Sequence, residues 1–189
     1  MAAAGYGIVH DEITAHLCVE YFTVAHPPLF HTTSPFLLGI CWGIAATIGL
    51  GLVFGCLLAA VSLGGEAPAS AQGTLVRRVG LLLGAMAVSA LLAGLAGFAL
   101  SRFSLVRLPA LLGSVIPFAR HDRFFAVWFA HLASYAVGLG GSAWLIFQVW
   151  CERGRPRVLT LWPRTPGGVV RVIALLAIVL LVIWWRRGG

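Results

Sequence analysis

The sequence predicts an all-α membrane protein: a polytopic helix bundle with about four transmembrane helices and an N-terminal interfacial helix. Three observations support this fold class. Of the 189 residues, 60% are apolar and only 10% are charged, whereas about 25% of the residues in soluble domains are charged. The apolar residues gather in runs that approach or exceed the roughly 20 residues needed to cross a bilayer. Glycine and alanine recur inside these runs at four-residue spacing, which is typical of packed membrane helices.

The predicted transmembrane bundle comprises residues 36–189. We expect its spans at residues 36–63, 79–100, 124–150 and 169–185. Tryptophan marks the ends of the last two runs at Trp150 and Trp184, as aromatic residues do at the membrane interface. The first span contains the small-residue pair Gly39 and Gly43, so we expect it to pack closely against a neighbour. The fourth run is almost purely Val, Leu and Ile, which favours a peripheral position facing lipid.

The first 35 residues are predicted to form a separate N-terminal region. We expect a helix from about His10 to Ala25, ended by Pro27 and Pro28. On a helical wheel, one face holds Ile13, Leu17, Tyr21 and Val24, and the adjacent face holds Glu12, His16, Glu20 and Thr23. Such a helix either lies on the membrane surface or packs against the bundle.

Residues 101–123 are predicted to form a second interfacial segment, between the second and third spans. The segment is apolar, but Pro109 and Pro117 interrupt it. It is therefore too short and too broken to span a bilayer, and it is expected to lie over one end of the bundle or to re-enter the membrane.

All six histidines are predicted to lie on one side of the membrane. They are His10, His16, His26, His31, His121 and His131. The N-terminal region precedes the first span and residues 101–123 follow the second, so two crossings return the chain to the side on which it began. His131 lies about two turns into the third span from that same side. Four of the six acidic residues share this side, namely Asp11, Glu12, Glu20 and Asp122.

This sorting predicts a histidine and carboxylate site that binds a divalent or transition metal ion or transfers protons. Imidazole and carboxylate groups ligate such metals, and imidazole titrates near neutral pH. The candidate metal ligands are His10, Glu20, His26, His121 and His131, because packing of the N-terminal helix over the third span would gather them. The sequence contains no HExxH motif and no closed set of Cys and His ligands, so it predicts no particular reaction.

His131 is the one histidine inside a predicted span. An ionisable group at that depth is costly and by default indicates function. The alternative interpretation is a neutral ring that is hydrogen-bonded to a helix carbonyl or to a tyrosine. A bis-histidine haem would need a second histidine in a spanning helix, and none is predicted.

A second hypothesis is a non-catalytic accessory subunit of a larger membrane complex. The small size, the glycine-rich packing faces and the lack of a complete catalytic motif favour it. A transporter or channel is less favoured, because a single ionisable residue lies deep within the spans and no repeat is evident. The expected partners are the lipid bilayer and either other membrane subunits or further copies of this chain. No nucleic acid is expected: the thirteen basic residues are all Arg, and most lie beside apolar runs, where they anchor helices at the interface.

The charge distribution predicts an extracytoplasmic N-terminus. The first 35 residues contain no Lys or Arg, whereas cytoplasmic segments are enriched in these residues. The Arg-rich stretch at 153–164 would then be cytoplasmic. The count over the whole chain, seven Arg inside against six outside, adds little to this prediction.

Part of the sequence resembles a group of small bacterial multi-pass membrane proteins with no assigned function. The resemblance rests on residues 10–16, 18–23 and 26–27, and on His121 and residues 130–135. It extends over about the first 150 residues and leaves out the fourth apolar run. It implies a location in the bacterial inner membrane and implies no activity.

Overall fold

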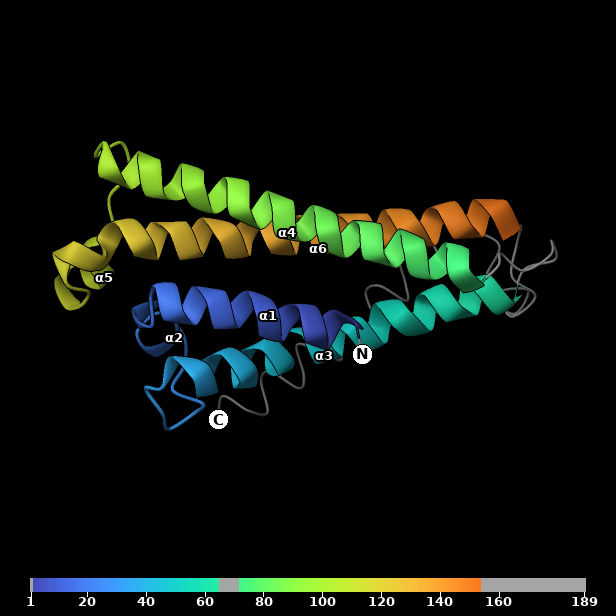
Figure 1. Ribbon diagram of the computed structural model, residues 1–189, viewed down its shortest axis with the longest axis horizontal. Coiled ribbons are helices and arrows are strands. Elements are labelled where there is room, and N and C mark those ends of the chain that lie inside the picture. The colour runs from blue at the N-terminus through green and yellow to red at the C-terminus, as the bar shows by residue number, and fades with distance from the viewer. Residues whose placement is uncertain (1, 65–71, 154–189) are drawn as a thin grey trace, which may run out of the picture.

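The computed structural model describes residues 2–64 and 72–153, and every regular element within these ranges is a helix (Figure 1). The all-α class is therefore confirmed. Three helices are long and apolar enough to cross a membrane: α3 (Pro35–Gly64), α4 (Gln72–Arg102) and α6 (His121–Arg153). Each of the first three predicted spans falls inside one of them. The predicted span at residues 169–185 lies outside the described residues.

The N-terminal region forms two helices and packs against the bundle. Helix α1 (Ala2–Leu17) begins eight residues before the predicted start, in an Ala-rich stretch that favours helix. The helix stops at Leu17, and the four-residue helix α2 (Glu20–Thr23) follows after Cys18 and Val19. The continuous helix expected from His10 to Ala25 is therefore wrong.

Helix α1 lies antiparallel to the first half of α3, and glycines allow a very close approach. An added Cβ on Gly43 would come within 2.6 Å of Ile8 Cα, and one on Gly39 within 2.8 Å of Glu12 Cα. At 1.5 Å per residue, α1 is roughly 24 Å long and α3 roughly 45 Å long. Because α1 reaches only about half the length of α3 (Figure 1), the second half of α3 has no helix of the N-terminal region beside it.

The face that α1 buries is not the predicted apolar face. Ile13 is 65% exposed and Leu17 is 40% exposed. The buried positions are Gly7, Asp11, Thr14 and Ala15. Small side chains on this face allow close backbone packing, and van der Waals contact is the main force between helices in a lipid environment. The larger apolar side chains are left to face outward.

Helices α4 and α6 form a second antiparallel pair. A Cβ on Gly97 of α4 would lie 2.6 Å from the carbonyl oxygen of Phe125 in α6. Near one end of the pair, the Arg78 guanidinium donates two hydrogen bonds to the Glu152 carboxylate, at 2.9 and 2.7 Å. At the other end, the Ser101 hydroxyl donates to Asp122 Oδ1 at 2.7 Å. These interactions at opposite ends fix the register between α4 and α6.

The outer faces of α3 and α4 carry large apolar side chains. Leu52 on α3 and Leu81 and Leu92 on α4 are each more than 60% exposed. The most apolar windows of the two helices have mean hydropathies of 2.4 and 2.2. A helix that is apolar on its exposed side fits a lipid environment, which agrees with the composition.

One end of the bundle gathers the short elements. Helix α5 (Ala110–Val115) and the 3-10 turn η1 (Phe118–Arg120) lie at the same end as α2 (Figure 1). Pro109 and Pro117 precede these two elements, as expected for segments that prolines interrupt. Tyr21 and Phe22 from α2 share an apolar core with Ile116 and with the first turns of α6. This core places α2 beside His131 of α6.

Candidate metal site

Three side chains from two helices form a group that could hold a metal ion. His10 and Asp11 come from α1 and His131 comes from α6, and each offers one ligand atom within 4.8 Å of the others. Asp11 and His131 are both buried, at 4% and 2% exposure. No other group of three such residues has this geometry among residues 2–64 and 72–153.

The ring of His131 is oriented by its own helix. Its Nδ1 lies 2.9 Å from the carbonyl oxygen of Val127, one turn earlier. A carbonyl can only accept, so Nδ1 carries the proton, and Nε2 of the neutral ring has a lone pair. That atom lies 3.2 Å from Asp11 Oδ1. A histidine that donates its second N–H to a carbonyl is the usual arrangement around a bound metal.

The spacing of the two atoms suits a shared cation. Metal–ligand bonds of about 2.0–2.1 Å in a tetrahedral site place neighbouring ligand atoms roughly 3.4 Å apart. The 3.2 Å between His131 Nε2 and Asp11 Oδ1 is close to this value. All three ligand atoms lie within 4.8 Å of one another, so a His10 nitrogen at this limit would move inward by roughly 1.4 Å to reach the tetrahedral spacing.

His10 is suited to act as a neutral ligand. Burial, reinforced by the neighbouring His131, lowers the pKa of His10 to about 4, so the imidazole keeps a lone pair at neutral pH. Its Nε2 is buried and makes no hydrogen bond within the described residues. A buried polar atom without a partner is uncommon and costs stability. A metal ion or a ligand would satisfy it.

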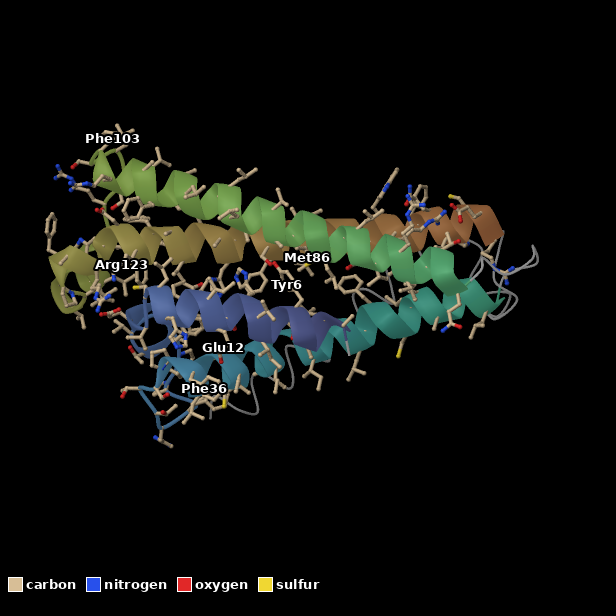
Figure 2. All side chains as sticks on the ribbon, in the orientation of Figure 1. Tyr6, Glu12, Phe36, Met86, Phe103 and Arg123 are labelled. Atoms are coloured by element: carbon tan, nitrogen blue, oxygen red, sulfur yellow. The ribbon has the colours of Figure 1, made fainter. Side chains whose placement is uncertain are left out.

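Aromatic rings enclose the site on the side of α2. The Tyr21 ring and the His10 ring both lie with their centroids 4.6 Å from the centroid of His131. On the other side, the hydroxyl groups of Tyr6 and Ser134 are 2.8 Å apart and link α1 to α6. Figure 2 shows Tyr6 near the middle of the long axis, on the same stretch as Met86 of α4. The site therefore lies inside the bundle, between α1 and the first half of α6.

The structure places the other three predicted ligands outside this group. Glu20 pairs with the guanidinium of Arg120, at 3.3 Å between Oε1 and Nε. His121 Nε2 donates to the carbonyl oxygen of Ile116 at 2.9 Å. Both interactions lie at the end of the bundle that holds α2 and α5.

His26 lies closer to the site but is separated from it by an aromatic ring. Its Nδ1 donates to the carbonyl oxygen of Tyr21 at 2.8 Å. The Tyr21 ring stands between the two histidines, 4.8 Å from His26 and 4.6 Å from His131. Of the five predicted ligands, the structure brings only His10 and His131 together.

Asp11 completes the group and was absent from the predicted ligands. The helical wheel puts Glu12 on the face that also holds His16 and Glu20, and it assigns Asp11 to neither of the two faces. The signal that could have found it is the four-residue spacing of Gly7, Asp11 and Ala15, because two small residues mark the face of a helix that packs most closely. A carboxylate between them must lie in the interface.

Comparison with protein-family models, with curated proteins and with solved structures gave no match for this chain. The resemblance to small bacterial membrane proteins thus stays a prediction, and the functional argument rests on the site itself.

Proposed function

We propose that this protein is a membrane protein that binds one divalent transition metal ion through His10, Asp11 and His131. The observation that carries the proposal is the placement of the His131 Nε2 lone pair 3.2 Å from Asp11 Oδ1, inside the bundle and beside a neutral His10. Two imidazoles and one carboxylate are a ligand set that suits zinc and ferrous iron. Three protein ligands leave a coordination position open for another molecule.

Metal analysis of the purified full-length chain tests the proposal. The protein should carry no histidine tag, and its metal content is measured after loading with Zn²⁺ or Fe²⁺ and removal of excess ion. We expect close to one ion per chain. His10→Gln, Asp11→Asn and His131→Gln should each lower the metal affinity at least tenfold, because even partners of metal ligands are worth about 10–100-fold.

Two histidine variants serve as matched controls. His16→Gln removes an exposed imidazole from α1, and His121→Gln removes a half-buried imidazole from the start of α6. Both variants should bind metal as the parent chain does. If all five variants bind alike, or if the parent chain takes up no ion, the proposed site is wrong.

Proton transfer is the second candidate, and the same pair of residues favours it. Without a metal, the His131 Nε2 lone pair and the Asp11 carboxyl group would share a proton across 3.2 Å. Infrared spectroscopy of the metal-free protein would then show a carboxyl band that responds to transfer of this proton and that Asp11→Asn removes. A protein that binds metal at this group and lacks such a band favours the first candidate.

The proposed location is the bacterial inner membrane, with the N-terminus outside the cytoplasm. The support is the absence of basic residues from the first 35 positions. An impermeant thiol reagent applied to intact cells tests this orientation, using a chain whose only cysteine replaces Thr33 in the loop before α3. Labelling is expected without cell lysis, and labelling that requires lysis would reverse the assignment.

A further inference from the structure

A cavity of about 290 Å³ adjoins the metal group and extends away from it. Helices α1, α3, α4 and α6 all contribute to its wall. Its volume lies near the lower end of the range for small-molecule sites, which is roughly 300–1,000 Å³. A single water molecule needs about 10–15 Å³ of such space, so the cavity would accept a chain of many heavy atoms.

The two ends of the cavity differ in chemistry. The end beside the metal group is polar and is lined by Tyr6, His10, Asp11, Ser134 and Tyr135. The rest is apolar and is lined by side chains such as Leu50, Phe54, Leu58, Leu82, Met86 and Leu145. The apolar part extends past the N-terminal end of α1, since Ala2 and Ala3 also line the cavity and α1 reaches only about half the length of α3.

The charges at the polar end restrict the head group of a ligand. The lining contains no Arg, and Asp11 supplies a carboxylate. In the metal-free protein, a fatty acid or a phospholipid phosphate would therefore meet the Asp11 side chain with no Arg in the lining to balance its charge. A neutral head group with oxygen atoms would find a hydrogen-bonding partner in the Tyr6 hydroxyl and, when no metal is bound, a second one in the unpartnered Nε2 of His10.

Aromatic rings at the polar end further favour a flat head group. The rings of Tyr6 and His10 are stacked, with centroids 5.7 Å apart and an interplanar angle of 19°. Tyr135 approaches His131 from another side, at 5.9 Å between centroids. Rings in such arrangements attract other aromatic or quinonoid rings by offset or edge contacts.

From these observations we propose that the cavity binds a lipid-soluble quinone, with its ring at Tyr6 and His10 and its hydrocarbon tail along α3 and α4. Both parts of the cavity are then filled by one molecule, and the bilayer around the bundle supplies it. Binding of this molecule needs the cavity and its polar end but does not need the metal, so the inference goes beyond the proposed function.

Binding of decylubiquinone to the full-length chain in detergent tests the proposal. The affinity is measured by equilibrium dialysis, once with metal and once with a chelator. We expect saturable binding of about one molecule per chain under both conditions. Failure of metal binding with intact quinone binding would overturn only the metal site, and the converse result would overturn only this inference.

A pair of glycine variants on α3 separates the tail site from general effects. Gly55 lines the cavity and Gly49 does not, and an added Cβ meets no atom within 4 Å at either position. Gly55→Leu should fill the apolar part and weaken quinone binding at least tenfold, while Gly49→Leu should leave it unchanged. Equal affinity in both variants would overturn the proposed tail site.

The head group is tested with one variant and two other ligands. Tyr6→Phe removes one hydroxyl and should weaken quinone binding about fivefold, which corresponds to a hydrogen bond of about 1 kcal/mol. Dodecanol and laurate carry comparable tails but lack the ring, and laurate is also charged. Both should bind more weakly than decylubiquinone. If either binds as tightly, the cavity holds any hydrocarbon chain and the quinone assignment is wrong.

Discussion

Asp11 Oδ1 and His131 Nε2 lie 3.2 Å apart although 120 positions separate the two residues in the sequence. Helix α1 has its extensive interface with α3, not with α6, where His131 lies. The distance across the site therefore depends on how α1 is seated on α3. This dependence links the glycines between α1 and α3 to the geometry of the metal site.

Gly43→Ala should weaken metal binding without touching a ligand. The added methyl group would lie 2.6 Å from Ile8 Cα, well inside ordinary contact distance, and backbone atoms cannot move away as a flexible side chain can. Helix α1 would have to shift from α3 by close to 1 Å, and a misplacement of about this size disrupts a preorganised site. We expect a loss of at least tenfold in Zn²⁺ affinity, measured by competition with a chromogenic chelator.

Gly49→Ala is the control on the same helix, since a Cβ there meets nothing within 4 Å. It should bind Zn²⁺ as the parent chain does. Equal affinities in Gly43→Ala and the parent chain would show that the seating of α1 does not set the geometry of the site.

Removal of the Asp11 carboxyl group should destabilise the metal-free protein. Asp11→Ala leaves the Nε2 of a fully buried His131 without its partner, and an unsatisfied buried group costs about 1–3 kcal/mol. Asp11→Asn keeps the shape, and its amide N–H can donate to Nε2, so its effect should be smaller. Unfolding by denaturant in detergent, with a chelator present, measures the difference.

The same measurement in a His131→Phe background gives the interaction energy between Asp11 and His131. There, Asp11→Ala should cost clearly less, because the group that it leaves unpaired is gone. Identical costs in the two backgrounds would mean that the pair is not coupled.

Gly97→Ala should loosen the α4 and α6 pair. The new methyl group would lie 2.6 Å from the carbonyl oxygen of Phe125 and would also strike the Phe129 ring. Overpacking of this kind costs about 1–3 kcal/mol, so the midpoint of thermal unfolding should fall. Gly84→Ala, on the same helix and in open space, should raise or maintain the midpoint because alanine favours helix. If Gly84→Ala lowered the midpoint and Gly97→Ala did not, the interface between α4 and α6 would lie elsewhere than at Gly97.

Cys18 should resist alkylation well above neutral pH. Burial is the main cause that raises the pKa of its thiol to about 12, and the neighbouring Glu20 adds to it. An ordinary cysteine is half converted to the reactive thiolate at a pH of about 8.5, whereas Cys18 stays almost entirely a neutral thiol at that pH. A chain with Cys18 as its only cysteine should therefore react slowly with maleimide at pH 7 to 9.

A chain with Cys151 as its only cysteine is the comparison, because this residue is exposed. It should react quickly, and both chains should react alike after denaturation. Rapid labelling of native Cys18 at pH 8 would contradict its burial between α2 and α6.

The spans and the sorting of the histidines could be predicted because they depend on local composition. A run of about 20 apolar residues has to form a helix in lipid, since its backbone polar groups find no other partners there. Even parity of the crossings then places the N-terminal region and the start of α6 at the same end, and Figure 1 shows α2 and α5 together there. The sequence also indicated His131, because an ionisable residue within a span is rare.

Tertiary structure alone decided which polar residues meet. The sequence cannot show that α1 ends at Leu17, so that Glu20 rotates away from Glu12 and pairs with Arg120. Nor does hydrophobic periodicity identify the buried face of α1, because in lipid the closest packing favours small residues while large apolar ones face outward. Because α1 buries its small-residue face, Asp11 lies against His131 and Ile13 is left exposed. Composition thus determined that these helices form and which of their ends lie together, while close packing between helices selected the carboxylate that completes the site.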